Sequence, residues 1–373
     1  MARKQFLSFL LIFSLLISYA SALAEADDDD DWDDNVDDAW EMEHPLHSGD
    51  YAYALLDDGT VEITSYGGAD TEIVIPDTLD GKPVTAIGER AFYYSLSLTS
   101  VTIPDSVTHI SQKAFSCCFQ LTSITLPSGL TAIESGTFDL CKSLTTIDIP
   151  DSVAAIADDA FIGCKALQSF TLSPNHPYFF LADDALCRTA DSTFLLYPNA
   201  REPRTYRIPD GITAISAYAF YDCDLLESVV VPDSVTQLPA RAFSGCSALA
   251  SVSLPDSLTE IGTAAFSGCS ALTGIRIPAA ITEIINHTFS GCTSLATLEI
   301  PDSVTKIGDY AFFGCTSLTS IAIPDSVTAI GNGAFSNCTA LTLTVTPDSY
   351  AAEYAKANNI PYTYPDANDW LNN

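Results

Sequence analysis

Apolar and polar positions repeat along this chain with a period of 23 residues, from Pro104 to Pro150 and again from Pro209 to Pro347. Three apolar columns run through ten units almost unchanged. The first contains Phe92, Phe115, Phe138, Phe161, Phe220, Phe243, Phe266, Phe289, Phe312 and Phe335. The second contains Ile87, Ile110, Ile133, Ile156, Ile215, Leu238, Ile261, Ile284, Ile307 and Ile330. The third contains Leu98, Leu121, Leu144, Leu167, Leu226, Leu249, Leu272, Leu295, Leu318 and Leu341. A fixed period of this length predicts a repeat solenoid, because each unit can bury its apolar face only against its neighbours.

Each unit contains a short alternating run that ends at the proline, such as Leu298-Glu299-Ile300 before Pro301. Alternation with β-branched residues predicts a strand with one buried face, and proline ends it because proline cannot donate to the ladder. Val304 and Ile307 indicate a second short extended segment, and the Ala-Phe-x-Gly-Cys stretch predicts a tight helical turn. We therefore expect 23-residue coils with short parallel β-strands, stacked about 4.8 Å apart.

Both ends of the repeat region, residues 50–346, are predicted to be covered. Asp58-Gly59 lies between two alternating runs and is typical of a β-hairpin turn, which predicts a hairpin N-cap. Near residues 341–346 the alternation shifts by one position. Because such a shift exchanges the two faces of a strand, we expect this strand to leave the regular coil. A short helix over 349–358 and a strand over 360–364 are expected to form a C-terminal cap within residues 347–373.

Residues 173–208 interrupt the period, since the step from Pro150 to Pro209 is 59 residues. Two apolar runs around Thr189-Ala190-Asp191-Ser192 predict a hairpin-like insertion that projects from the stack. One interpretation is a variant coil that packs its aromatic residues on the solenoid, and the other is a ligand-binding loop. The hydrophobicity of the aromatic residues favours the first interpretation.

The N-terminal segments have a different composition. Residues 1–24 combine Arg3 and Lys4, an apolar run and a small-x-small site at Ala22-Leu23-Ala24, which predicts a cleaved signal peptide. Residues 25–49 are rich in aspartate and are predicted to form a disordered spacer. Loose Ca²⁺ binding is the alternative for this segment, although the EF-hand pattern is absent.

The pattern Leu-x-x-Ile-x-Ile-Pro-x-x-Val-x-x-Ile-Gly-x-x-Ala-Phe-x-x-Cys resembles the BspA-type, or Treponema-type, leucine-rich repeat. The resemblance covers roughly residues 50–365. It implies a secreted or cell-surface protein, often an adhesin or host-interaction module. A repeat fold does not by itself define a ligand.

Nine of the eleven cysteines occupy one repeat position. They are Cys118, Cys141, Cys164, Cys223, Cys246, Cys269, Cys292, Cys315 and Cys338. Parallel side chains in a ladder do not suit the S–S dihedral angle, and a straight column without histidines does not provide a zinc cluster. We expect buried thiols that pack as small hydrophobes. Cys117 and Cys187 lie outside the column and are the candidates for reactivity or pairing.

No catalytic motif is present, and the five histidines lie in unrelated units. We therefore expect no enzymatic activity, no cofactor and no metal site. An aspartate follows the proline in many units, and we interpret it as a turn residue. These aspartates are Asp105, Asp151, Asp233, Asp256, Asp302 and Asp325. The formal net charge of −33 disfavours nucleic acid as a partner, because phosphate recognition needs clustered basic residues. No membrane span is expected after signal cleavage, and the protein is expected to be a monomer.

The outward residue of each strand differs from unit to unit, whereas the core columns barely vary. These candidate ligand-face residues are Thr102, Thr125, Asp148, Thr171, Arg207, Val230, Ser253, Arg276, Glu299 and Ala322. Repeat proteins bind through extended faces, so this column predicts an extracellular adhesion or protein-interaction module that binds a protein or glycan. The alternative is a structural surface or spacer protein whose exposed strand positions are simply unconstrained.

Overall fold

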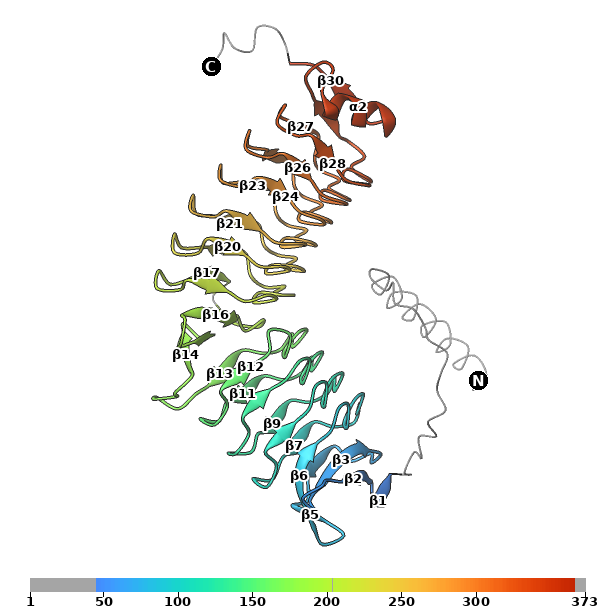
Figure 1. Cartoon of the computed structure of the whole chain (residues 1–373), viewed down its shortest axis with the longest axis vertical. Helices are drawn as coiled ribbons and strands as arrows, with labels where there is room; N and C mark the ends of the chain where they lie inside the picture. Colours follow the sequence, from blue (N-terminus) through green and yellow to red (C-terminus); the bar gives the residue numbers. More distant parts are fainter. Residues whose placement is uncertain (1–44, 203, 366–373) are drawn as a thin grey trace, which may run out of the picture. The chain divides into compact units, whose positions relative to one another are not determined.

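The computed structural model describes residues 45–202 and 204–365. This part of the chain is a stack of coils, most of which contribute two short strands joined by tight turns (Figure 1). The predicted signal peptide, residues 1–24, and most of the predicted acidic spacer, residues 25–49, lie outside the described residues. The same is true of the end of the C-terminal tail, from residue 366 onward.

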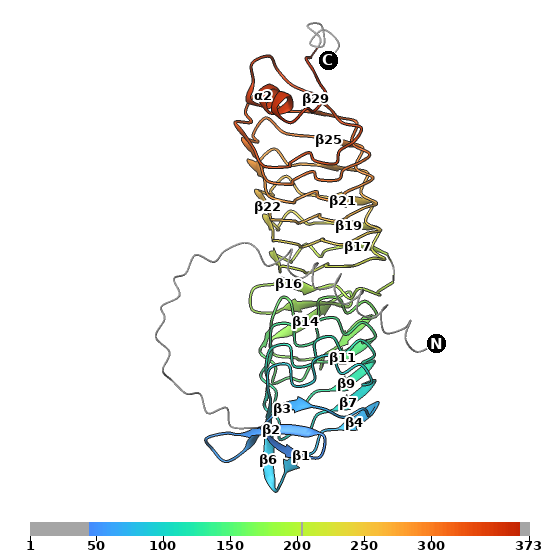
Figure 2. The same ribbon diagram turned by 90° about the vertical axis from the view of Figure 1, so that its right-hand side faces the viewer.

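The strands form two rows, which lie on different sides of the stack in Figure 2. The first row consists of β4 (Glu72–Val74), β7 (Ser100–Thr102), β9 (Ser123–Thr125), β11 (Thr146–Asp148), β13 (Ser169–Thr171), β17 (Thr205–Arg207), β19 (Ser228–Val230), β21 (Ser251–Ser253), β23 (Gly274–Arg276), β25 (Thr297–Glu299), β27 (Ser320–Ala322) and β29 (Thr342–Thr344). The second row consists of β6 (Lys82–Ile87), β8 (His109–Ile110), β10 (Ala132–Ile133), β12 (Ala155–Ile156), β16 (Thr193–Leu196), β18 (Ala214–Ile215), β20 (Gln237–Leu238), β22 (Glu260–Ile261), β24 (Glu283–Ile284), β26 (Lys306–Ile307) and β28 (Ala329–Ile330). All the pairs within a row are parallel, as the repeat predicts.

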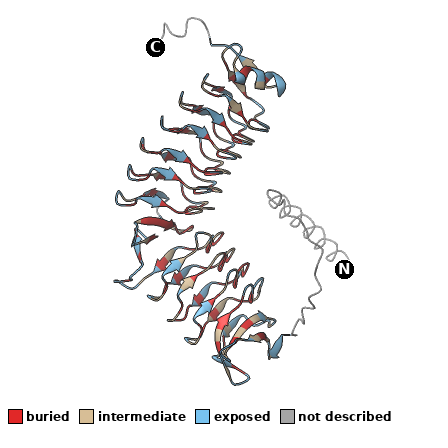
Figure 3. Ribbon diagram, viewed as in Figure 1, coloured by how far each residue is buried: buried red, intermediate tan, exposed pale blue. Residues whose placement is uncertain are grey.

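The core is built from the predicted columns, and buried residues line the inside of every coil (Figure 3). Phe266 is fully buried and stacks on Phe243 and Phe289, with ring centroids 5.4 Å and 5.7 Å apart. Rings at this spacing gain stacking energy beyond their buried area. In the Ile/Leu column only Ile156 is half-buried. The expected leucine-rich solenoid is thus confirmed.

The predicted helical turn after each second-row strand is replaced by a series of tight turns. Two residues of this stretch, four positions apart, have left-handed backbone angles, as at Tyr310 (φ 53°) and Gly314 (φ 72°). A left-handed residue interrupts a right-handed helical turn. The backbone between them pairs with the next coil instead, since the N–H of Phe312 donates to the carbonyl of Ala334 at 2.8 Å.

The N-terminal end is covered by a meander of β1 (Leu46–Ser48), β2 (Tyr51–Leu55) and β3 (Val61–Tyr66), which pair antiparallel. The turn between β2 and β3 contains Gly59, whose φ of 83° explains the choice of glycine. β3 then pairs in parallel with β6 of the first coil. The longer first coil forms a second hairpin, in which β5 (Thr78–Leu79) pairs with the start of β6. The predicted hairpin N-cap is confirmed.

The C-terminal end is covered by α2 (Tyr350–Ala357) and β30 (Tyr362–Thr363). Ser349 caps the helix, because its hydroxyl accepts the N–H of Ala352. The expectation that the strand near 341–346 leaves the coil is wrong. β29 pairs in parallel with β27, and Leu343 lies opposite Ile321 and is fully buried. This coil is one residue shorter than the others, which compensates for the shifted alternation.

Residues 173–208 form one enlarged coil rather than a regular coil plus a projecting loop. β14 (Phe179–Ala182) and β15 (Ala185–Arg188) form an antiparallel hairpin, and β15 pairs antiparallel with β16. β16 is wholly buried and continues the second row through its parallel pairing with β18. In β14, Phe180 and Leu181 remain partly exposed. The enlarged coil thus supplies a layer of the stack.

This layer separates two apolar clusters of the core. Leu186 and Leu195 belong to the cluster that extends back to Tyr53, whereas Phe194 and Cys187 belong to the cluster that extends forward to Ala355. Leu186 and Cys187 of β15, and likewise Phe194 and Leu195 of β16, therefore face opposite clusters, as alternation along a strand predicts.

Candidate ligand-binding face

The ten candidate residues all lie at the last position of a first-row strand. Where neighbouring strands pair, these positions are directly in register, as in Arg207–Val230–Ser253 and Arg276–Glu299. Thr102 and Val230 are half-buried, and the other eight are exposed. The structure thus aligns them as one outward column, interrupted between Thr171 and Arg207 by the enlarged coil.

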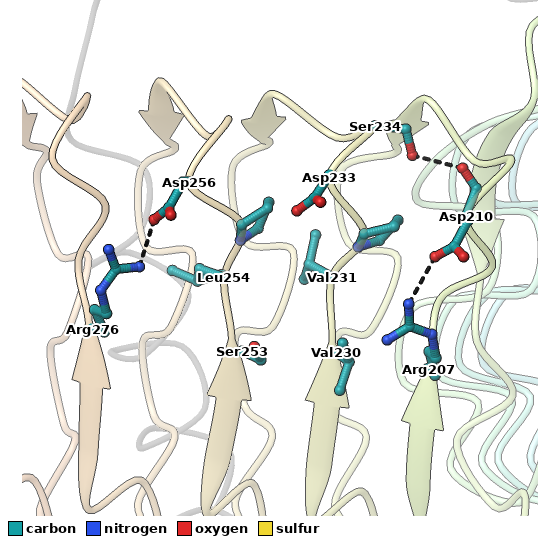
Figure 4. A pocket seen from close by; sticks show the side chains of 12 residues that line it. Arg207, Asp210, Val230, Val231, Asp233, Ser234, Ser253, Leu254, Asp256 and Arg276 are labelled. Carbon is teal, nitrogen blue, oxygen red and sulfur yellow. Dashed lines mark hydrogen bonds and ion pairs between the residues drawn. The ribbon is translucent and has the colours of Figure 1, made fainter.

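Four of these residues line an open groove of about 560 Å³. Val230 and Ser253 form part of its floor between Arg207 and Arg276, which lie at its two ends (Figure 4). One side is formed by the residues that follow the prolines of three successive coils. These residues are Asp210, Asp233 and Asp256. The sequence pointed to the strand residues of this groove but not to the aspartates beside them.

Both arginines of the groove are paired with carboxylates. Arg207 Nη2 lies 2.9 Å from Asp210 Oδ1, and Arg276 Nη1 lies 2.6 Å from Asp256 Oδ1. All four side chains are largely exposed, so solvent screens these ion pairs and they contribute little to stability. Each pair places a guanidinium group beside a carboxylate at one end of the groove.

Some of the aspartates after the prolines, which the sequence suggested were turn residues, accept hydrogen bonds from the next coil, as Asp151 does from Ser173. Asp105 Oδ1 accepts hydrogen bonds from the backbone N–H and the hydroxyl of Ser128, one coil later. These bonds hold the pKa of Asp105 below its usual value, the backbone bond first. Asp233 lies at the middle of the groove, is exposed and extends from the turn towards solvent (Figure 4). Its carboxylate can therefore accept hydrogen bonds from a bound molecule.

The cysteines have a role that the sequence did not reveal. All eleven are free, and ten are buried. Each column thiol donates to the backbone carbonyl of the core aromatic residue one coil earlier, for example Cys246 to Phe220 at 2.9 Å and Cys292 to Phe266 at 3.1 Å. Cys117 and Cys187, the candidates for reactivity or pairing, are both buried and unpaired. Burial raises the pKa of Cys187 to about 12, which disfavours the reactive thiolate.

The part of the chain that the structure describes contains no group of three or more histidine, cysteine, aspartate or glutamate side chains placed to hold a metal ion. Over the same residues, no helix has the length and apolar character needed to cross a membrane.

These features define a leucine-rich-repeat solenoid with an exposed strand face. Residues 71–182 and 208–344 match the family model described as the BspA type leucine rich repeat region, in six copies. The chain therefore belongs to the BspA-type leucine-rich repeat family. Proteins of this kind are typically interaction or structural modules rather than enzymes.

Solved structures show the same fold. A leucine-rich cell surface protein from Faecalibacterium prausnitzii is 31% identical, with 84% of this chain and 97% of that chain covered and a TM-score of 0.51. A leucine-rich repeat protein from Eubacterium ventriosum is 24% identical, with 78% and 93% covered and a TM-score of 0.60. The pneumococcal vaccine antigen PcpA is 18% identical, with 87% and 99% covered and a TM-score of 0.62. No curated protein sequence matches this chain.

Proposed function

We propose that this protein is an extracellular adhesion or interaction module, secreted or held at the cell surface, that binds a protein or glycan partner through the outward column of its first strand row. Membership of the BspA-type family supports a surface or interaction role. The relative from Faecalibacterium prausnitzii is itself described as a cell surface protein, which supports the location.

The proposal rests on the difference between the buried columns, which barely vary in sequence, and the outward column, which varies from coil to coil. The phenylalanine and leucine columns are nearly constant and buried. The outward column, held in register by parallel pairing, presents hydroxyl, acidic, basic and apolar side chains in turn. Because strand pairing sets the backbone positions about 4.8 Å apart before binding, no backbone ordering is needed to align these side chains with a partner. This column can therefore recognise an extended partner.

The residue types of the outward column favour a binding role over a catalytic one. The outward column contains no histidine or cysteine, and its two arginines are both paired with aspartates. Such paired arginines, on a chain of net charge −33, do not form the basic patch that nucleic acid requires. We further propose that the protein acts as a monomer and needs no cofactor.

The test is a binding screen of the purified protein against extracellular-matrix proteins, mucins and glycans. The informative variants are Arg276→Glu and Glu299→Arg, which reverse two charges adjacent in the first row. The matched controls are Glu283→Lys and Lys306→Glu, which reverse two charges adjacent in the second row.

We expect a saturable partner whose Kd rises about tenfold or more in the first-row variants and stays unchanged in the controls. If the folded protein binds none of the molecules in the screen, the result would instead support the alternative that it is a structural surface or spacer protein. Equal losses in both variant pairs would place the binding surface elsewhere.

A further inference from the structure

The groove between Arg207 and Arg276 offers many hydrogen-bonding sites that its own ion pairs leave open. A guanidinium has five N–H donors and a carboxylate has about four lone-pair sites. The pairs Arg207–Asp210 and Arg276–Asp256 each use one close contact. Asp233 and the hydroxyl of Ser253 add acceptors and a donor between them. A ligand can therefore bind donors and acceptors in alternation without breaking either ion pair.

The charges around the groove disfavour an ionic ligand. Its charged lining is two arginines against three aspartates, on a chain of net charge −33. An anion would meet Asp233 and the long-range negative field, whereas an extended cation would meet a guanidinium at each end. A neutral ligand rich in hydroxyl groups avoids both penalties, because each hydroxyl both donates and accepts.

The strands beneath the groove disfavour an extended peptide backbone. β17, β19 and β21 are consecutive strands of one parallel sheet, so their N–H and C=O groups are paired with each other. A peptide lying across this face finds no free edge to which it could add as a strand. Recognition must come from side chains, which suits hydroxyl groups better than peptide groups.

We propose that this groove binds a neutral oligosaccharide that runs across β17, β19, β21 and β23. The inference rests on the proposed function, since it places the ligand on the same outward column and specifies its chemical class. The arginines lie three strand intervals apart, about 14 Å, so the site spans several sugar rings rather than one. Arg207 and Arg276 donate to the ends of the bound segment, and Asp233 accepts from its middle.

The experiment measures binding of neutral hexasaccharides (cellohexaose, maltohexaose, mannohexaose and a β-1,3-linked glucohexaose) by calorimetry and saturation-transfer NMR. An anionic hyaluronan hexasaccharide and hexalysine serve as charged probes. Ser253→Trp fills the groove floor without changing any charge. Thr125→Trp, at an exposed position of the same column outside the groove, is the matched control.

We expect at least one neutral hexasaccharide to bind, with a loss of tenfold or more in Ser253→Trp and no change in Thr125→Trp. The affinity should change less than twofold with added salt, because no net charge is neutralised. Binding of hyaluronan or hexalysine that Ser253→Trp abolishes would overturn the proposal, as would the absence of binding by every neutral probe.

The same variants separate this inference from the proposed function. If Thr125→Trp or Glu299→Arg abolishes binding of a partner from the screen and Ser253→Trp does not, the outward column would still be the binding face, but the groove would not be the binding site. A partner that no first-row variant affects would reject both.

Discussion

The thiol of Cys269 donates a hydrogen bond to the backbone carbonyl of Phe243, one coil earlier, at 3.1 Å. The same carbonyl also accepts the backbone N–H of Cys246 at 3.3 Å. The cysteine column thus links successive coils through buried groups that cannot reach water. This geometry accounts for cysteine at the position, because the side chain is small, packs as an apolar group and still donates weakly.

Replacing Cys269 with alanine should lower the free energy of unfolding by about 1 kcal/mol, because the carbonyl loses a buried donor and a small void remains. Cys269→Ser should lose less, since the hydroxyl can donate to the same carbonyl. Urea denaturation of both variants and the wild-type protein in reductant provides the measurement. An alanine variant as stable as wild type would show that the thiol contact has no energetic role.

Stability should fall at alkaline pH. Burial raises the pKa of Cys118 and Cys292 to about 12, from an ordinary value of 9.0. Below pH 9 these thiols are protonated in both the folded and the unfolded state, so their contribution is fully present. As the pH rises from 9 towards 12 only the unfolded state ionises, and stability is lost by about 1.4 kcal/mol per pH unit for each such thiol.

The measurement is the urea midpoint of the reduced protein between pH 8 and pH 11. Cys292→Ala should have a shallower pH dependence than wild type, by the amount expected for one thiol. A midpoint that does not change across this range would contradict the burial of the column.

Cys338 should be the first thiol to react with an electrophile. It is half-buried, unlike the other ten, and lines an open hollow of about 290 Å³ beside α2. The neighbouring Cys315 side chain lowers the pKa of Cys338, which increases its thiolate fraction. Brief iodoacetamide treatment followed by peptide mapping should find this residue modified and the others modified only after unfolding. Fast labelling that persists in Cys338→Ser would contradict the assignment.

Substitutions in the enlarged coil should destabilise the N-terminal or the C-terminal apolar cluster, depending on which cluster the replaced side chain belongs to. Leu186→Ala removes a side chain from the N-terminal cluster, and Phe194→Ala removes one from the C-terminal cluster. Each should cost about 2–5 kcal/mol, because both side chains are fully buried.

Hydrogen exchange at β9 and β21 can distinguish the two effects. Leu186→Ala should accelerate exchange more at β9, and Phe194→Ala should accelerate it more at β21. Identical patterns in the two variants would mean that the core unfolds as a single unit. Repeat proteins couple mainly to neighbouring units, which favours the local outcome.

Much of the solenoid could be predicted because the 23-residue period fixes which residues share a column. Phe266 and Leu272 follow from periodicity alone, and so does the outward position of Arg276. The turn after each second-row strand was missed, although the glycine at Gly314 and its equivalents signalled left-handed backbone. The register of β29 was missed because a one-residue deletion restores the pairing of Leu343, and deletions are not visible in alternation alone.

The groove, too, could be predicted only in part from the sequence. The period places Asp256 and Arg276 on neighbouring coils, but it does not say that their side chains turn towards each other. That contact depends on the path of the turn after Pro255, which is a local backbone property. Residues 189–192, around which a hairpin was expected, connect the antiparallel strands β15 and β16. The position of the enlarged coil as a layer of the stack was harder to predict, because it depends on contacts with both clusters.

The central claim is that the outward column of the first row is the binding face. Hydroxyl-radical footprinting of the protein, with and without the strongest partner from the screen, tests it most directly. The account predicts protection concentrated on β17, β19, β21, β23 and β25, with the second row unchanged. Protection confined to the second row, or to Phe180 and Leu181 of the hairpin, would contradict it.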